Sequence, residues 1–101
     1  MNLDTLQLYC DVVRLRSFSR GASANEISQS AVSQAIQQLE ADLDVQLLDR
    51  TKRPLTVTPE GRIFYDACRD LLDRYEQARG RIASAKAWQH LGLNPPQTKL
   101  I

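Results

Sequence analysis

The chain has 101 residues, of which 43% are hydrophobic and 25% are charged. These values are typical of one folded domain of a soluble protein, and they exclude two separate cores and a membrane-spanning chain. The formal net charge is only +1, so bulk charge does not by itself indicate a nucleic-acid partner. The N-terminus lacks a basic segment and contains Asp4 and Asp11, so we expect a cytoplasmic protein without a secretion signal.

Few residues offer catalytic or metal-binding chemistry. Cys10 and Cys68 lie 58 positions apart, and His90 is the only histidine. This spacing matches no disulfide framework and no metal site. Both cysteines fall on apolar helical faces, so we expect them to be buried as small hydrophobic residues. Phosphate-loop and hydrolase motifs are missing, so we expect no enzyme activity, no metal and no cofactor.

The first two helices are predicted from apolar spacing and capping residues. A helix over residues 3–16 is indicated by apolar residues at helical spacing, namely Leu3, Leu6, Tyr9, Cys10 and Val13. Residues 17–19 break this pattern, and Ser19 is predicted to cap a short helix from Arg20 to about Asn25. Gly21 lowers helix propensity there, so this second helix is predicted to be weak.

The third helix is predicted to begin after a cap at Ser28. One of its faces is apolar with the helical period and should be buried, through Val32, Ala35, Ile36, Leu39 and Leu43. The opposite face is polar but uncharged, with Ser30, Ser33, Gln34 and Gln37. Exposed helix faces usually carry Glu and Lys, and here the carboxylates of Glu40 and Asp42 occur only in the C-terminal part.

A β-hairpin and a long helix are predicted to follow. The hairpin has one arm at residues 46–51, a second at 55–58 and an exposed turn at Lys52-Arg53-Pro54. Thr58, Pro59 and Glu60 then form a strong helix start, and no proline interrupts the helix before about His90.

The long helix carries a heptad pattern of apolar residues over three repeats, comprising Phe64, Cys68, Leu71, Tyr75, Ala78, Ile82 and Ala85. We expect its first part, around residues 64–71, to pack against the domain. A helix of about 46 Å is too long for one small domain to cover, so the remainder indicates a partner helix, most economically from a second copy. The predicted dimer interface contains Leu71, Leu72, Tyr75, Ala78, Ile82 and Ala85.

The order of these elements predicts a mainly α fold of the winged helix-turn-helix type, with three helices and a two-stranded wing before a long dimerisation helix. The major groove of DNA admits an α-helix, where glutamine can bond to adenine and serine can donate or accept. The free N–H groups after Ser28 suit a phosphate, and Arg50, Lys52 and Arg53 in the wing can neutralise others.

Residues 1 to about 90 resemble the N-terminal domain of LysR-type transcriptional regulators. The resemblance rests on motifs in a specific order and spacing, namely the Leu3/Leu6 helix, Ser17-Phe18-Ser19-Arg20, Ile27-Ser28-Gln29-Ser30-Ala31-Val32-Ser33, Ile36-Gln37-Gln38-Leu39-Glu40, Leu47-Leu48-Asp49-Arg50-Thr51 and Thr58-Pro59-Glu60-Gly61. It implies groove contacts from Gln29, Ser30, Ser33, Gln34 and Gln37, backbone contacts from Arg50 and Arg53, and a dimerising role for the long helix.

The resemblance also implies three segments, and the sequence departs from the family pattern in the second helix, at Gln34 and in stopping before the effector domain expected after the long helix. Residues 1–58 form the DNA-binding domain, 59–90 the dimerisation helix, and 91–101 a tail or the start of an effector domain. Gly21 replaces the usual alanine and Asn25 the usual leucine, so we expect a loosely held second helix. Gln34 replaces a basic or small residue and should alter sequence preference.

The predicted function is therefore regulation of transcription by a homodimer of bacterial type that binds specific double-stranded DNA. A higher oligomer and a small-molecule effector are expected only through an effector domain beyond residue 101. One alternative is an interaction module that pairs with a full-length relative and titrates it without needing DNA. Another is a molybdate-responsive type of regulator, which has a similar N-terminal domain.

Overall fold

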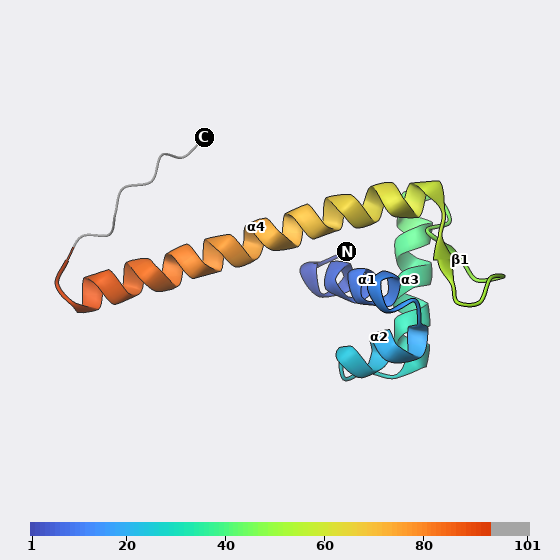
Figure 1. Cartoon of the computed structure of the whole chain (residues 1–101), viewed down its shortest axis with the longest axis horizontal. Helices are drawn as coiled ribbons and strands as arrows, with labels where there is room; N and C mark the ends of the chain where they lie inside the picture. The colour runs from blue at the N-terminus through green and yellow to red at the C-terminus, as the bar shows by residue number, and fades with distance from the viewer. Residues whose placement is uncertain (94–101) are drawn as a thin grey trace.

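The computed structural model describes residues 1–93. In chain order they form α1 (Leu3–Leu15), α2 (Phe18–Ala24), α3 (Gln29–Leu43), β1 (Leu48–Asp49), β2 (Thr56–Val57) and α4 (Pro59–His90). Helices α1–α3 and the two strands gather at one end of α4, whose remainder extends away from them as a rod (Figure 1). The predicted winged helix-turn-helix with a long final helix is confirmed. Most of the predicted tail, residues 94–101, lies outside the described residues.

Side-chain caps set the starts of the helices. The Ser28 hydroxyl accepts a hydrogen bond from the Ala31 N–H at 3.1 Å, and the Thr58 hydroxyl accepts one from the Gly61 N–H at 3.0 Å. Both predicted caps are confirmed. The prediction that Ser19 caps α2 is wrong, because Ser17 does so by accepting from the Arg20 N–H at 3.1 Å. The reason is that α1 ends at residue 15 and the backbone is already extended at Ser17. The cap of α2 therefore lies two residues before the predicted one.

The core lies between α1, α3 and the first turns of α4. Its largest fully buried side chains include Tyr9, Val12, Val32, Ile36, Leu39, Leu47, Leu48 and Cys68. Cys10 and Cys68 are both buried and free, as predicted. The prediction that Leu43 belongs to the buried stripe is wrong, because it lies on the last turn of α3, where the chain reverses at Asp44, and 37% of it is exposed.

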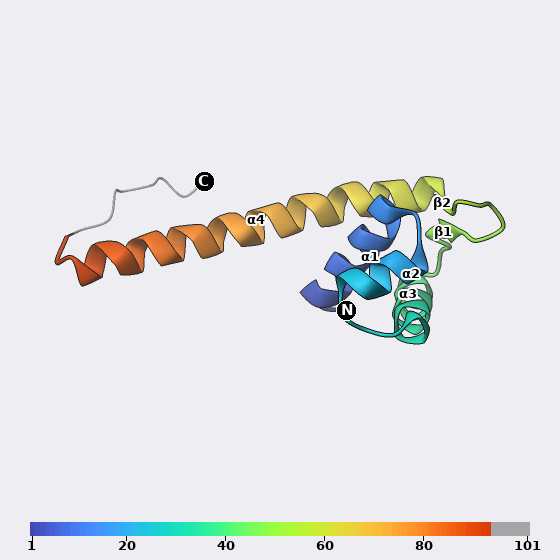
Figure 2. The same ribbon diagram turned by 60° about the horizontal axis from the view of Figure 1, so that its bottom comes forward.

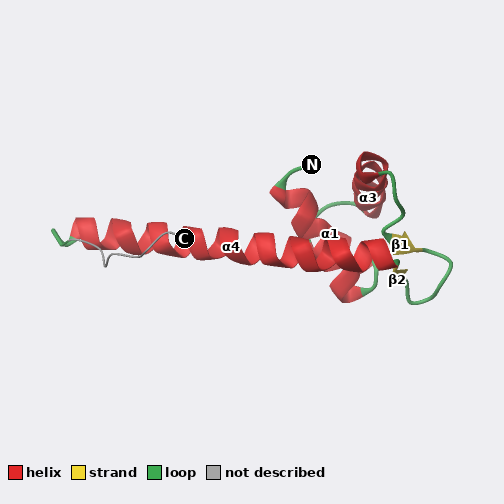
Figure 3. Ribbon diagram, turned by 90° about the horizontal axis from the view of Figure 1, so that it is seen from above, coloured by secondary structure: helices red, strands yellow, loops and turns green. Residues whose placement is uncertain are grey.

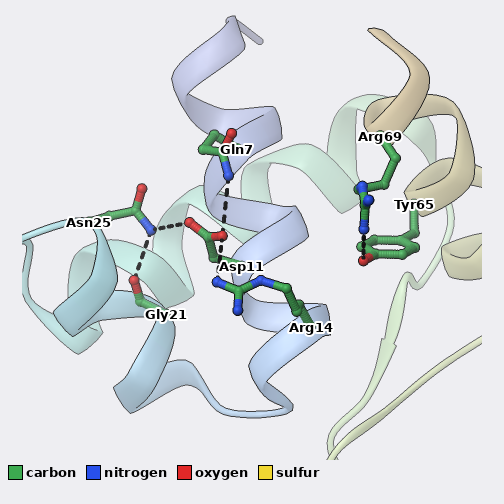
Figure 4. Close-up of polar contacts among 7 residues, drawn as sticks. All are labelled: Gln7, Asp11, Arg14, Gly21, Asn25, Tyr65 and Arg69. Atoms are coloured by element: carbon green, nitrogen blue, oxygen red, sulfur yellow. Dashed lines mark hydrogen bonds and ion pairs between the residues drawn. The ribbon is translucent and has the colours of Figure 1, made fainter. Parts of the chain in front are cut away.

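A polar network attaches α2 to α1 (Figure 4). The Asn25 amide donates to the buried Asp11 carboxylate at 3.0 Å and to the Gly21 carbonyl at 2.9 Å. Gly21 is buried, and a Cβ there would lie 2.6 Å from a methyl group of Val12, so glycine permits the close approach of the two helices. The expectation of a loosely held second helix is therefore wrong, since both departures from the family pattern make specific contacts.

The wing is a short antiparallel hairpin beside the start of α4 (Figure 2). Leu48 pairs with Val57 and Asp49 with Thr56, so each strand has only two residues. The predicted arms at residues 46–51 and 55–58 are therefore too long, because most of the hairpin is loop. Below the wing, the Leu47 carbonyl accepts from the Thr58 N–H at 3.1 Å, which joins β1 to the start of α4.

Helix α4 has two different halves. Phe64, Cys68 and Leu72 on its first half pack against the core, as predicted for that part of the helix, but Leu71, which was expected to pack there too, is 53% exposed. Seen from above, the second half passes no other described element (Figure 3). Within residues 1–93, every helix is too short or too polar to be a candidate for crossing a membrane.

Candidate nucleic-acid interface

The polar face of α3 is exposed. Gln29, Ser30, Gln34 and Gln37 are exposed and Ser33 is half-buried. Among the described residues, none of these five side chains takes part in a hydrogen bond, whereas the neighbouring Gln38 donates to Asp42 at 3.0 Å. Ser28 differs, because its hydroxyl caps the helix. The face therefore offers free amide and hydroxyl groups to a partner.

The wing contains one ion-paired cation and two cations without an ion pair within residues 1–93. The Arg50 guanidinium pairs with the Glu40 carboxylate at 2.9 Å and lies 5.4 Å from the centre of the Phe18 ring. Its charge is therefore largely compensated and its position is restrained. Lys52 and Arg53 are exposed, and neither forms an ion pair within residues 1–93. These two side chains are the wing cations that remain available to an anion.

Asp49 organises the first part of the wing turn. Its carboxylate accepts hydrogen bonds from the Thr51 hydroxyl and from the Thr51 N–H, the latter at 3.0 Å. These bonds favour the ionised form, so they hold the pKa of Asp49 below its ordinary value, with the nearby Lys52 adding to the effect. The turn is thus closed by local hydrogen bonds before the chain reaches Lys52.

Glu40 is a structural residue of the site that the sequence did not identify. One carboxylate oxygen accepts from the Leu47 N–H at 2.7 Å, and the other receives the Arg50 guanidinium. The side chain of Glu40 is only 10% exposed, so the carboxylate joins the end of α3 to the base of the wing. The available signal was its position in the motif before the Leu47-Leu48 pair, and that motif does not reveal a contact seven residues away.

A groove of about 500 Å³ opens between the α1–α2 turn, the start of α3 and the wing. We call it the basic groove; it is lined by Arg16, Ser17, Phe18, Ser19, Gln29, Ser33, Arg50, Lys52, Arg53, Pro54 and Leu55. Four of these residues are cationic and none is acidic, although the whole chain carries a net charge of only +1. The fold therefore concentrates positive charge beside α3. Arg16, Ser17 and Ser19 were not predicted as site residues, because they are remote in sequence from the wing.

The predicted dimer residues lie mostly on the surface of α4. Leu71, Tyr75, Ala78 and Ile82 are exposed and Ala85 is half-buried. Leu72 is different, because it is half-buried and packs against the core of its own domain. The exposed members of this set form an apolar face that continues along the second half of the helix.

Comparison with known proteins identifies the family. The model for bacterial regulatory helix-turn-helix proteins of the lysR family matches residues 3–62. The nitrogen assimilation regulatory protein nac of Klebsiella aerogenes is 40% identical over 79 residues, which cover 78% of this chain and 26% of that protein. The HTH-type transcriptional regulator BenM of Acinetobacter baylyi is 38% identical over 96 residues, covering 92% of this chain and 32% of BenM.

Solved structures of similar proteins support the same family assignment. The crystal structure of a BenM_DBD/catB site 1 DNA complex superposes with a TM-score of 0.84 at 36% identity, and the match covers 89% of this chain and 97% of that one. Vibrio fischeri DarR in complex with DNA gives a TM-score of 0.77 at 26% identity, covering 82% of this chain and 28% of DarR. The chain spans about a quarter to a third of the length of the curated relatives it matches. This chain belongs to the lysR family of bacterial regulatory helix-turn-helix proteins.

Proposed function

We propose that this chain is the DNA-binding domain of a transcriptional regulator and acts as a homodimer on specific double-stranded DNA. The observation that carries the proposal is the exposed α3 face, whose amides and hydroxyls have no partner among the described residues and lie beside the basic groove. The similarity of the fold to a DNA complex of a relative at 36% identity supports the same function.

In this mechanism α3 enters the major groove. Gln34 is the reader that we assign to a base, because it is exposed on this face and glutamine can bond to both N6 and N7 of adenine. Lys52 and Arg53 bind phosphates, which fixes the position of α3 without reading sequence. Arg50, held by Glu40, supports the base of the wing. The N–H groups at the start of α3, after Ser28, face the DNA backbone.

The variant Gln34→Ala tests the reading role. We expect a loss of about 1–3 kcal/mol on the preferred duplex, confined to one base pair, and little change on random DNA. The duplex is first selected from a random library, and fluorescence anisotropy then measures binding to it and to single-base variants. Gln38→Ala is the matched control, because the same change on the same helix removes a side chain already bonded to Asp42. An equal loss on selected and random DNA would contradict base reading by Gln34.

The apolar face of α4 supports the homodimer. Ile63 is 73% exposed, Leu71 is 53% exposed and Ile82 is 59% exposed. At 100° per residue these three side chains, together with Ala67, Ala78 and Ala85, project from one side of the helix. A second copy of α4 would cover this side, and the three exposed large residues would gain most from the burial.

Charge favours an antiparallel arrangement of the two helices. Residues 59–73 contain four acidic and two basic residues, whereas residues 74–90 contain four basic and one acidic residue. Antiparallel pairing places the acidic half of one helix beside the basic half of its partner, and parallel pairing would place like charges together. It also brings the second half of the partner helix over Ile63, which no element of its own domain covers.

The variant Ile82→Glu tests this interface. We expect it to shift the protein from dimer to monomer in sedimentation velocity, because a carboxylate would be buried without a counter-ion. Ala83→Glu is the control, since the neighbouring residue projects about 100° away from the face. A dimer that persists in Ile82→Glu at the same protomer concentration would rule out the interface.

The same α4 face would also serve an interaction module that pairs with a longer relative. Gel shifts with the purified chain at low salt separate this alternative from the DNA-binding function. A dimer that shifts neither selected nor random DNA would favour the interaction module, whereas a retarded complex favours DNA binding by this chain.

A further inference from the structure

Part of the lining of the basic groove comes from the α1–α2 turn. Arg16, Ser17 and Ser19 line the groove together with Lys52 and Arg53 of the wing. No carboxylate is among the lining residues, so an anion entering the groove meets cations from both the turn and the wing. The reading face of α3 borders the same groove through Gln29 and Ser33.

Arg16 supplies the free charge of the turn. It is exposed and forms no ion pair within residues 1–93, whereas the guanidinium of Arg50 is paired with Glu40 at 2.9 Å. Arg16 also lines a second groove of about 370 Å³, together with Arg14 and Arg62, and no carboxylate lines that groove either. Each of the other two arginines is paired with an aspartate of its own helix, so Arg16 is the arginine of this second groove that forms no ion pair within residues 1–93.

The backbone of Arg16 has a left-handed conformation. Arg16 ends α1 in the left-handed conformation, with φ 53° and ψ 38°, and its N–H bonds to the Val13 carbonyl at 3.3 Å. Glycine is the residue that adopts this conformation without steric cost, and it is the usual choice after a helix end. Glu26 and Asp44 also have a positive φ, after α2 and α3, so the backbone fixes where the Arg16 side chain leaves the turn, and its role follows from its charge and its place in the groove.

We propose that one strand of the DNA backbone lies in the basic groove and that Arg16 binds one of its phosphates. This inference rests on the proposed function of the chain. Arg16 on one side and Lys52 and Arg53 on the other hold the strand between the α1–α2 turn and the wing. The hydroxyls of Ser17 and Ser19 can each donate to a phosphate oxygen, because the cap of α2 uses the Ser17 oxygen only as an acceptor from the Arg20 N–H. The contact positions α3 and carries no sequence information.

The salt dependence of DNA binding tests the assignment. Each phosphate neutralised by a cationic side chain contributes about one unit to the slope of log affinity against log salt. Fluorescence anisotropy with a labelled random-sequence duplex measures this slope for the wild type and the variants. We expect Arg16→Ala and Arg16→Gly to reduce the slope by about one unit, and Arg16→Lys to retain it.

Two controls keep the test specific. Glycine tolerates the left-handed backbone, so Arg16→Gly should stay folded by circular dichroism, and any loss of slope then belongs to the missing charge. Arg69→Ala removes the same charge from the first half of α4, at a residue that lines neither groove beside Arg16, and should leave the slope unchanged. If Arg16→Gly and Arg16→Ala keep the wild-type slope, or if Arg69→Ala lowers it equally, the phosphate contact is refuted while DNA binding stands. If the wild type binds no duplex, the proposed function fails as well.

Discussion

Replacing Gly61 with alanine should destabilise the fold strongly, although alanine is the better helix former. A Cβ at residue 61 would overlap the carbonyl oxygen of Leu47 and lie 2.8 Å from its carbonyl carbon and 3.0 Å from the Tyr9 hydroxyl. These neighbours are restrained, because Leu47 is 1% exposed and its carbonyl accepts from the Thr58 N–H. Tyr9 is fully buried and donates to the Gly61 carbonyl at 2.7 Å. Helix α4 would therefore have to move away from β1.

The size of the effect follows from the contacts that this movement disturbs. Overpacking a filled core costs about 1–3 kcal/mol. Weakening the bond from the buried Tyr9 hydroxyl costs about 1–3 kcal/mol more, whereas alanine returns about 1 kcal/mol of helix propensity. The free energy of unfolding should thus fall by about 3 kcal/mol, from a total that is about 5–15 kcal/mol for most domains.

Gly80 provides a matched control on the same helix. A Cβ there meets no atom within 4 Å, so Gly80→Ala should raise the free energy of unfolding by about 0.5–1 kcal/mol. Urea unfolding followed by far-UV circular dichroism measures both variants, at one protomer concentration because dimerisation adds to stability. We expect the two alanine variants to shift the midpoint in opposite directions. A Gly61→Ala midpoint at or above that of the wild type would refute the close-contact reasoning.

Two further predictions concern buried polar and titratable groups. Glu40→Ala leaves the Leu47 N–H without its acceptor and should lower the free energy of unfolding by about 1–3 kcal/mol, measured by urea unfolding. The same change at the exposed Asp42 should lower it by less than about 0.5 kcal/mol. Similar losses in the two variants would show that the Glu40 bonds do not stabilise the fold. Burial raises the pKa of Cys10 to about 11 and of Cys68 to about 12 from an ordinary 9.0. The unfolded chain therefore loses these protons first, so the stability from the protonated thiols is complete below pH 9.0 and is lost as the pH rises through about 11 for Cys10 and about 12 for Cys68. Urea midpoints near neutral pH and near pH 10 should differ less in a variant with both cysteines replaced by alanine, and an equal difference would contradict this origin.

Much of the secondary structure could be predicted because it depends on neighbours in the sequence. The hydroxyls of Ser28 and Thr58 accept hydrogen bonds from N–H groups three residues later, so the starts of α3 and α4 can be predicted from a few neighbouring residues. The apolar period of α3 identified the side that packs into the core, and the uncharged opposite side was exposed as expected. The hairpin was predicted from its residue pattern, and the family resemblance added the expected roles of the wing and of the long helix.

Local patterns failed where two local solutions were equally good or where the partner was distant. Serine is a good capping residue at position 17 or 19, and the end of α1 at residue 15 left Ser17 to cap α2. Gly21 lowered the helix propensity of α2 in the sequence, but in the fold it allows α2 to approach α1. In the sequence Asn25 only stood where the family usually has leucine. In the fold its amide donates to the Asp11 carboxylate, which is 14 residues away in the chain.

The candidate interface divides in the same way. By itself the sequence determined the reading face of α3 and the apolar face of α4, because helical periodicity assigns residues to one side of a helix without knowledge of the rest of the chain. Only the tertiary structure decided that Glu40 pairs with Arg50, and that Arg16 lines the same groove as Lys52 and Arg53. Ion pairs and grooves depend on which distant segments the core brings together, and that packing is set by burial of the whole apolar surface rather than by any short motif.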